Sequence, residues 1–501
     1  MSYGEKIITG TSTVFLMHIL GGASAYILRL FLARNLTLEE FGLFYAVLYF
    51  VGFLTIFRDL GFGPTLTKYI AEFSAKNDNK SIKSSVIIVL MIELLAGIVL
   101  ASIVFLFSDQ LSDFYFKAAA TDVLLVIVLS FVISSFVILQ YVFQGLGKIK
   151  QYAIIEPVRN FFTLLVTVSL IGFGIIGAAY GYLIASVMIS IIIFLMMLRV
   201  FPFFSIKAKI SKELSKRIFL FSLPVFFTGI GGTILVYTDN LVITYFLSLR
   251  DVGLYNAALP TSQLLWVLVG SITVALLPVV SYLHAKNDKN TLSKIIGLLV
   301  KFSFIATIPF VLIVMSFPDV VIKILFGDGY VGAAPTLQVL ALTSLFYSTF
   351  SIMYTSILGV GKPSINVKVI SFIAVIDLIL NIVFVPTMGI IGAAITTLVS
   401  YFIGTVISVK YMKKEIDFRF YWKDMVKSFL CGLAVFVLIF YLKVFVKAEP
   451  VIEAAIASFM GIAAYVALLY ATRSIKKDEI TLLKKSGVPV PIFFIKLFDR
   501  L

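Results

Sequence analysis

Apolar stretches of about 20 residues recur along the whole chain, separated by short polar segments. As a helix, a stretch of this length crosses the hydrocarbon core of a bilayer. A transmembrane barrel would instead show short alternating strands. The pattern therefore predicts an all-α polytopic membrane protein with fourteen spans, at 11–33, 41–57, 85–107, 121–144, 152–171, 177–198, 218–247, 253–281, 295–317, 335–358, 365–385, 390–410, 428–446 and 451–472.

Four short motifs occur twice, in the same order and at a nearly constant offset of 210 to 215 residues. Such regularity predicts a duplicated unit of six spans. The pairs are Gly-Leu-(Phe/Tyr)-(Tyr/Asn)-Ala at 42–46 and 253–257, Ala-Lys-Asn-Asp at 75–78 and 285–288, Gly-x-Gly-Lys at 145–148 and 359–362, and Gly-Ile-Ile-Gly-Ala-Ala at 174–179 and 389–394.

The duplication predicts two parallel six-helix repeats that form two lobes around a central cavity. Because an even number of spans separates the copies, both lobes have the same orientation in the bilayer, as in transporters built from parallel repeats. We expect a first lobe at 1–198, a basic cytoplasmic linker at 199–217, a second lobe at 218–410, helices 13 and 14 within 411–472, and a basic amphipathic cytoplasmic tail at 473–501.

Composition excludes several classes of function. Of 501 residues, 60% are hydrophobic and 13% charged, whereas a soluble domain carries roughly 25% charged residues. One cysteine and two histidines exclude internal disulfides and a cysteine- or histidine-based metal site. The Gly-x-Gly-Lys turns lack the first Gly and the final Ser/Thr of a P-loop. We therefore expect a transporter with no catalytic residues and no nucleotide site.

Basic residues are concentrated on one side of the predicted membrane. If the N-terminus is inside, cations are far more frequent in the inside segments than in the outside ones. This bias predicts a protein of the cell membrane with both termini in the cytoplasm. It also explains the formal net charge of +15, which suits an anionic leaflet. We expect membrane lipids, and no nucleic acid, as partners.

Ionisable residues inside a span are costly and are candidates for function. Arg29 of span 1 either reaches the outer interface or faces a cavity, and we interpret His18 on the same stripe as a packing residue. Glu93 of span 3 is expected to pair with an Arg or a Lys. Glu156 and Arg159 of span 5 either pair with each other or face a cavity.

The repeat places polar residues at matching positions in both halves. An offset of 214 carries Thr163 to Asp377 and Thr167 to Asn381, and an offset of 211 carries Arg29 to Asn240, next to Asp239. We infer that these faces line a hydrated cavity. Asp239 and Asp377 then carry a coupling proton or Na⁺, or else they form hydrogen bonds between helices.

Several of these features together resemble a known family. They are twelve duplicated spans followed by two more, an Arg in the first span, and the segment Phe-Arg-Asp-Leu-Gly-Phe-Gly-Pro-Thr-Leu-Thr-Lys-Tyr-Ile-Ala-Glu at 57–72. The Gly-Leu-Gly-Lys turn and the Gly-Ile-Ile-Gly-Ala-Ala opening of span 6 are also similar. Over essentially the full length, the chain resembles the polysaccharide-export flippases of the multidrug/oligosaccharidyl-lipid/polysaccharide exporter superfamily.

The resemblance implies a flippase that moves polyprenyl-pyrophosphate-linked oligosaccharide to the outer leaflet by alternating access, coupled to an ion or to the membrane potential. Other polysaccharide-assembly proteins are further expected partners, and no cofactor is expected beyond a coupling H⁺ or Na⁺. The resemblance implies cationic head-group residues at Arg29, Arg34, Arg58, Lys68 and Arg159. Cavity or coupling roles are expected for Asp239, Asn240, Asp377, Asn381, Glu93 and Glu156.

Two alternative functions remain at this point. A multidrug or cation antiporter of the same superfamily would need an acidic cavity, whereas spans 1 and 5 offer cations as well as acids. A membrane glycan polymerase or acyltransferase would need larger external loops than this chain has.

Overall fold

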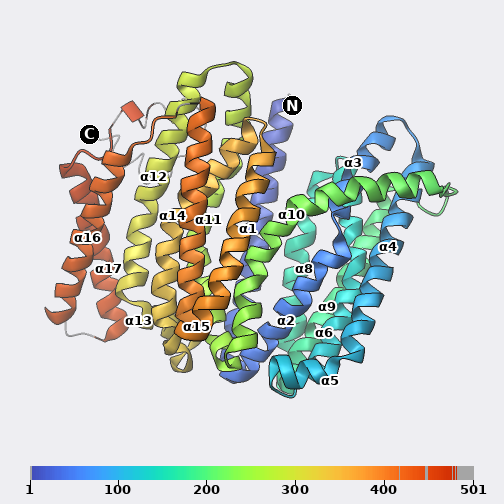
Figure 1. Cartoon of the computed structure of the whole chain (residues 1–501), viewed down its shortest axis with the longest axis horizontal. Coiled ribbons are helices and arrows are strands. Elements are labelled where there is room, and N and C mark those ends of the chain that lie inside the picture. Colours follow the sequence, from blue (N-terminus) through green and yellow to red (C-terminus); the bar gives the residue numbers. More distant parts are fainter. Residues whose placement is uncertain (1–2, 417, 446–448, 477, 480, 482–501) are drawn as a thin grey trace. The chain divides into compact units, whose positions relative to one another are not determined.

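The computed structural model describes residues 3–416, 418–445, 449–476, 478–479 and 481. All elements found in these residues are helices (Figure 1), which confirms the predicted all-α fold class. Contacts divide the chain into Met1–Gly253 and Leu254–Leu501, called here unit 1 and unit 2. Each unit is described by itself.

Within its described residues, unit 1 contains ten complete α-helices, three short 3₁₀ or π helices and the first residues of α11. They are α1 (Tyr3–Asn35), α2 (Leu38–Asp59), α3 (Phe62–Ala75), α4 (Asn79–Leu106), α5 (Ser108–Gln110), η1 (Leu111–Phe116), α6 (Thr121–Ile133), η2 (Ser134–Leu139), α7 (Gln140–Gly145), α8 (Ile149–Leu170), η3 (Ile171–Phe173), α9 (Gly174–Val200) and α10 (Lys212–Phe246).

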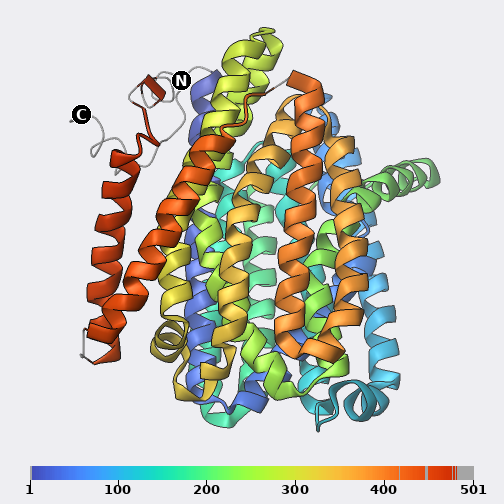
Figure 2. The same cartoon turned by 60° about the vertical axis from the view of Figure 1, so that its left-hand side comes forward.

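Unit 2 begins within α11 (Leu249–Ala285), which is bent between Val267 and Ile272. The elements that follow are α12 (Lys289–Ser316), α13 (Pro318–Phe326), η4 (Asp328–Ala333), α14 (Ala334–Gly359), α15 (Pro363–Ile416), α16 (Trp422–Phe445) and α17 (Pro450–Ala471). The last two helices lie side by side (Figure 2).

Eleven of the described helices are long and apolar enough to cross a membrane, or twelve if the bent α11 counts as one span. Two of these candidates, at 149–200 and 363–416, each hold two helices joined at a glycine turn. Large apolar side chains remain exposed along α4, including Leu95, Val99 and Leu106, as expected of a surface that faces lipid. The structure thus shows a multi-pass membrane protein, and the count of fourteen spans stays a prediction.

The repeated Gly-Ile-Ile-Gly-Ala-Ala motif forms the same tight turn in both units. Gly174 and Gly389 have φ/ψ of 67/−148 and 64/−148, a conformation that residues other than glycine rarely adopt. A Cβ on Gly177 would lie 2.0 Å from the Leu170 carbonyl oxygen, and one on Gly392 would lie 2.4 Å from that of Phe384. Both glycines of the motif are therefore needed to turn one helix back against the next.

The repeated Ala-Lys-Asn-Asp motif also has the same local structure in both copies. Asn77 and Asn287 have positive φ values of 53 and 55, and each is followed by an aspartate that caps the next helix. Asp78 accepts from the Ser81 N–H and Asp288 from the Thr291 N–H, both at 3.0 Å. These shared local structures support the duplication inferred from the sequence.

Helix α10 packs against α2, α3, α4 and η1 of unit 1, and Figure 1 shows it turning sharply along its length. Pro224 lies inside the helix and removes one backbone hydrogen bond, which favours a bend. Near Pro224, α10 approaches the α2–α3 turn, where a Cβ on Gly61 would lie 2.7 Å from the Phe226 backbone nitrogen. Its second half lies on α2, where the Tyr237 ring contacts Gly52. The repeat assigns α10 to the second lobe, whereas its contacts place it in unit 1. The lobe boundaries derived from the repeat therefore stay a prediction.

A buried lysine joins the last helices to the core of unit 2. Lys301 of α12 has no exposed surface, and its Nζ donates to Asp424 Oδ2 at 2.7 Å and to Glu479 Oε2 at 2.8 Å. Asp424 lies in the first turn of α16, and Glu479 follows α17. Breaking one side of such a buried pair is strongly destabilising. Most of the predicted tail, residues 482–501 with its aromatic stretch, lies outside the described residues.

Candidate functional site

A polar pocket opens between α1, α7 and α8 of unit 1, and we call it the α1–α8 pocket. Its cavity is about 230 Å³ and is lined by His18, Gln140, Tyr152, Ala153, Glu156 and Arg159. The four α8 residues recur at helical spacing, so they share one face of that helix. A cavity lined by charged and amide side chains inside a membrane span is unusual, because such groups are costly there.

Glu156 pairs with His18 rather than with Arg159. The Nδ1 atom of His18 lies 2.5 Å from Glu156 Oε2, and these side chains are 58% and 37% exposed. Gly21 allows α1 to approach α8 closely, and Asn160 Nδ2 donates to the Gly21 carbonyl at 3.0 Å. His18 therefore lines the pocket, whereas the sequence pattern predicts a packing residue at this position. Arg159 is exposed.

The two arginines of α1 lie outside this pocket. The Arg29 guanidinium stacks over the Tyr45 ring at 4.0 Å, a cation–π contact that holds it between α1 and α2. Arg34 is exposed in the last turn of α1. Arg29 is therefore held in place by an aromatic ring.

Arg58 and Glu93 lie inside unit 1, each less than one-tenth exposed. Arg58 Nη1 donates to the Phe131 carbonyl at 2.6 Å and to Ser134 Oγ at 2.7 Å. Its side chain passes Gly97, one turn after Glu93, where a Cβ would lie 3.5 Å from Arg58 Cδ. Arg58 thus binds α2 to α6. Glu93 is buried close to this arginine, and an Arg or a Lys is the kind of partner that the sequence predicts for it.

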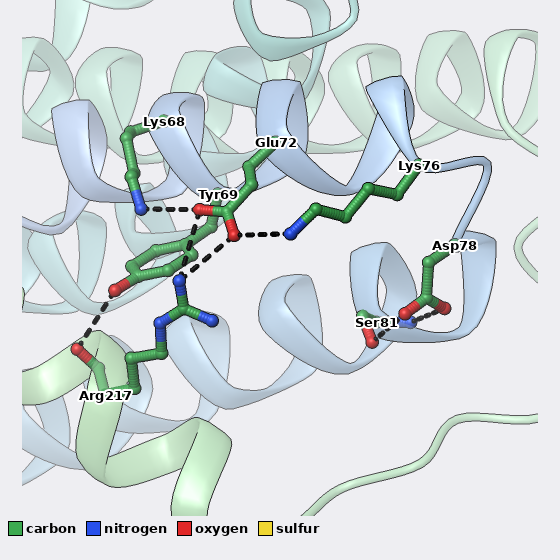
Figure 3. A network of polar contacts seen from close by, with 7 residues as sticks. All are labelled: Lys68, Tyr69, Glu72, Lys76, Asp78, Ser81 and Arg217. Carbon is green, nitrogen blue, oxygen red and sulfur yellow. Dashed lines mark hydrogen bonds and ion pairs between the residues drawn. The ribbon is translucent and has the colours of Figure 1, made fainter.

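Lys68 belongs to a separate charged cluster, shown in Figure 3. Its Nζ lies 2.6 Å from Glu72 Oε2, and the same carboxylate accepts from Lys76 at 3.1 Å and from Arg217 at 3.0 Å. The first three residues lie on α3 or just after it, and Arg217 lies in the first turns of α10. We call this group the Glu72 cluster.

The predicted polar residues of α10 are buried. Asp239 is 4% exposed and Asn240 is fully buried. The Asn240 carbonyl accepts from Thr244 Oγ1 at 2.7 Å, within the same helix. The structure therefore places these two residues away from bulk water.

Asp377 of unit 2 accepts hydrogen bonds from a serine hydroxyl and an asparagine amide. Its Oδ1 accepts from Ser400 Oγ at 3.0 Å, and its Oδ2 accepts from Asn381 Nδ2 at 3.2 Å. Asp377 is 2% exposed and Asn381 is fully buried. Since Ser400 follows the Gly389 kink, the Ser400–Asp377 bond joins the two halves of α15.

Sequence reasoning missed Gln140, Tyr152, Ser400 and Arg217. Gln140 had a usable signal, because it is an amide within the predicted apolar span 121–144. Among the described residues, no group of three His, Cys, Asp or Glu side chains could hold a metal ion.

Two family models match the chain. The model described as "Polysaccharide biosynthesis protein" (Polysacc_synt) matches residues 7–284, and the MatE model matches residues 224–387. Their overlap falls on α10, α11 and the segments beside them.

Similar curated proteins span nearly the whole chain. An uncharacterised membrane protein of Methanocaldococcus jannaschii is 29% identical over 462 residues, which cover 88% of this chain and 91% of that protein. The probable low-salt glycan biosynthesis flippase Agl15 of Haloferax volcanii is 22% identical, over 91% of this chain and 94% of Agl15.

Solved structures share the fold at low sequence identity. The lipid II flippase MurJ in an inward closed conformation has a TM-score of 0.72 at 18% identity, over 90% of this chain and 97% of MurJ. An inward-facing multidrug resistance MATE family transporter has a TM-score of 0.65 at 17% identity, over 79% of this chain and 94% of its own. At these identities the likeness shows the fold alone.

Proposed function

Because the chain belongs to the polysaccharide biosynthesis protein family, whose model covers more than half of it, we propose that it flips a lipid-linked glycan across the membrane. The relatives and structural neighbours are described as flippases and transporters. The protein is accordingly a membrane transporter and not an enzyme.

The proposed substrate is an oligosaccharide joined to a polyprenyl lipid through a diphosphate. The α1–α8 pocket is the observation that carries this proposal, since it gathers charged and hydrogen-bonding side chains within a membrane span. Arg159 supplies a guanidinium, which binds phosphate oxygens by charge-assisted hydrogen bonds. Gln140, Tyr152 and Glu156 supply donors and acceptors that suit sugar hydroxyls.

Asp377, with its hydrogen-bond partners Asn381 and Ser400, is the proposed coupling site. A carboxylate buried with an amide and a hydroxyl can take up either a proton or a small cation. Asp239, Asn240 and Glu93 are further buried candidates for the same role. The proposed direction of transport is towards the outer leaflet, and the positive-inside bias predicts that both termini lie in the cytoplasm.

Reconstituted liposomes test this function. We expect purified protein to move a fluorescent lipid-diphosphate-linked oligosaccharide between leaflets, detected when an added glycosidase reaches the labelled glycan. Arg159→Gln should slow this movement at least about tenfold, the loss expected for a charge-assisted hydrogen bond. Lys150→Gln is the matched control, because Lys150 is exposed on the same helix outside the pocket. If wild-type protein moves no glycan faster than empty liposomes do, the proposed function is wrong.

A multidrug or cation antiporter is the second candidate. The match of residues 224–387 to the MatE model favours it. Expression in a host that lacks its own drug exporters separates the two. Resistance to a cationic dye without any glycan movement would identify an antiporter, whereas glycan movement without resistance supports the flippase.

A further inference from the structure

The Glu72 cluster carries more positive charge than its own carboxylate can balance. Lys68, Lys76 and Arg217 all lie within 3.1 Å of the Glu72 carboxylate oxygens. Three cations around one anion leave an excess of two positive charges. The three cationic side chains are 40%, 64% and 53% exposed, so an anion from solvent or from a lipid surface can reach them.

Two of the three cations, Lys68 and Arg217, are held in place by an aromatic side chain beneath them. The Tyr69 ring lies 3.9 Å from Lys68 Nζ and 5.1 Å from the Arg217 guanidinium carbon. Its hydroxyl donates to the Arg217 carbonyl at 3.3 Å, which binds α3 to α10. Figure 3 shows the cations converging on Glu72 over this ring. Such preorganisation lowers the entropy cost of binding a ligand.

The nearby carboxylate of Asp78, also shown in Figure 3, is engaged elsewhere. Asp78 accepts from the Ser81 N–H at 3.0 Å and from the Ser81 hydroxyl at 2.6 Å. It therefore serves as the cap of α4. Within the part of the chain that the structure describes, Glu72 is the acid that contacts all three cations.

The duplicated segment of unit 2 does not contain this cluster. An offset of 210, taken from the Ala-Lys-Asn-Asp pair, carries Lys68 to Pro278, Glu72 to Tyr282 and Lys76 to Lys286. Lys286 instead lies over the Tyr282 ring at 4.6 Å. Since the matching helix folds without the charges, the cluster is not a requirement of the fold.

We propose that the Glu72 cluster is an anion site that binds the diphosphate of the lipid-linked substrate before it enters the transport path. A diphosphate diester carries twice the negative charge of a phospholipid phosphodiester, so it matches the excess charge better. The identity of the substrate rests on the proposed function above, whereas diphosphate binding at the cluster does not. Glu72 then acts as an internal competitor for the same cations.

Binding of inorganic pyrophosphate to the purified full chain tests the site, measured by calorimetry in neutral detergent micelles. We expect a Lys76→Gln/Arg217→Gln double variant to bind at least about tenfold more weakly, since it loses two charge-assisted contacts. Lys286→Gln is the matched control and should bind like the wild type. Equal affinity in the double variant would overturn the proposal.

Two further measurements distinguish a diphosphate site from a structural cluster and from a phospholipid site. Glu72→Gln removes the internal competitor and should bind pyrophosphate more tightly, whereas weaker or unchanged binding would assign the cluster a structural role only. In nanodiscs, phosphatidylglycerol should displace pyrophosphate poorly, and strong displacement would show a phospholipid site instead. If pyrophosphate binds as expected but liposomes show no glycan movement, the site stands and the flippase function fails.

Discussion

The polar faces of α8 and of the first half of α15 occupy matching places in the repeat, yet they differ in access to water. In unit 1, Glu156 and Arg159 line an open pocket with His18. In unit 2, Asp377 and Asn381 are buried and bonded to each other and to Ser400. The two matching helices therefore offer, at different positions along their length, an accessible surface for a large polar ligand in one unit and an enclosed carboxylate, suited to a small ion, in the other.

The glycine turns are common to both units, so their removal should affect both alike. Gly177→Ala and Gly392→Ala place a methyl group against a backbone carbonyl oxygen. We expect each to destabilise the protein by about 3 kcal/mol or more, measured by unfolding in mixed micelles. Gly172→Ala is the control, because no atom lies within 4 Å of its added Cβ. A tolerated alanine at either position would show that the turns are not equivalent.

Asp377→Ala should reveal the difference between the units. It leaves the Ser400 hydroxyl and the Asn381 amide without this acceptor, at a cost of about 2 kcal/mol. Thr163→Ala, at the matching position in unit 1, should change stability by no more than about 0.5 kcal/mol. Asp377→Asn should recover stability but remove the dependence of transport on a proton or Na⁺ gradient. Retained ion dependence in that variant would exclude Asp377 as the coupling residue.

The two helix caps should share a sensitivity to acid. Hydrogen bonds from the Ser81 hydroxyl and N–H lower the pKa of Asp78, and those from the Thr291 N–H and hydroxyl lower the pKa of Asp288. Because the folded pKa is below the unfolded one, each cap stabilises the protein at neutral pH. This contribution is lost as the pH falls below about 4. Asp78→Asn and Asp288→Asn keep a cap, and their unfolding should depend less on pH in this range than that of the wild type.

Glu156→Gln should have only a small effect on stability. The His18–Glu156 pair is substantially exposed, and exposed pairs contribute about 0–1 kcal/mol. Glycan movement in liposomes should nevertheless slow, because the pocket loses a charged acceptor. A large loss of stability with normal transport would reverse this assignment and make the pair structural.

The sequence predicted most of the fold because glycine and capping motifs act locally. The repeated Gly-Ile-Ile-Gly-Ala-Ala and Ala-Lys-Asn-Asp segments determine their own turns, so they could be recognised before any contact was known. The polar faces that hold Glu156 and Asp377 were also predicted, because their polar residues recur at the spacing of a helix. Partners from other helices could not be predicted. His18 contacts Glu156 because Gly21 lets α8 pack closely against α1. Arg217 contacts Glu72 because α3 and the start of α10 lie side by side.

The buried Lys301 makes the final packing of unit 2 depend on residues that are synthesised much later. Its partners Asp424 and Glu479 follow it by 123 and 178 residues, so a ribosome makes the lysine long before either carboxylate. Until then the ammonium group must stay near water, since burying it alone is costly. The packing of α12 can therefore be completed only after the C-terminal part of the chain has been synthesised. A chain terminated before Glu479 would leave α12 incompletely packed and expose it to the quality control of the cell.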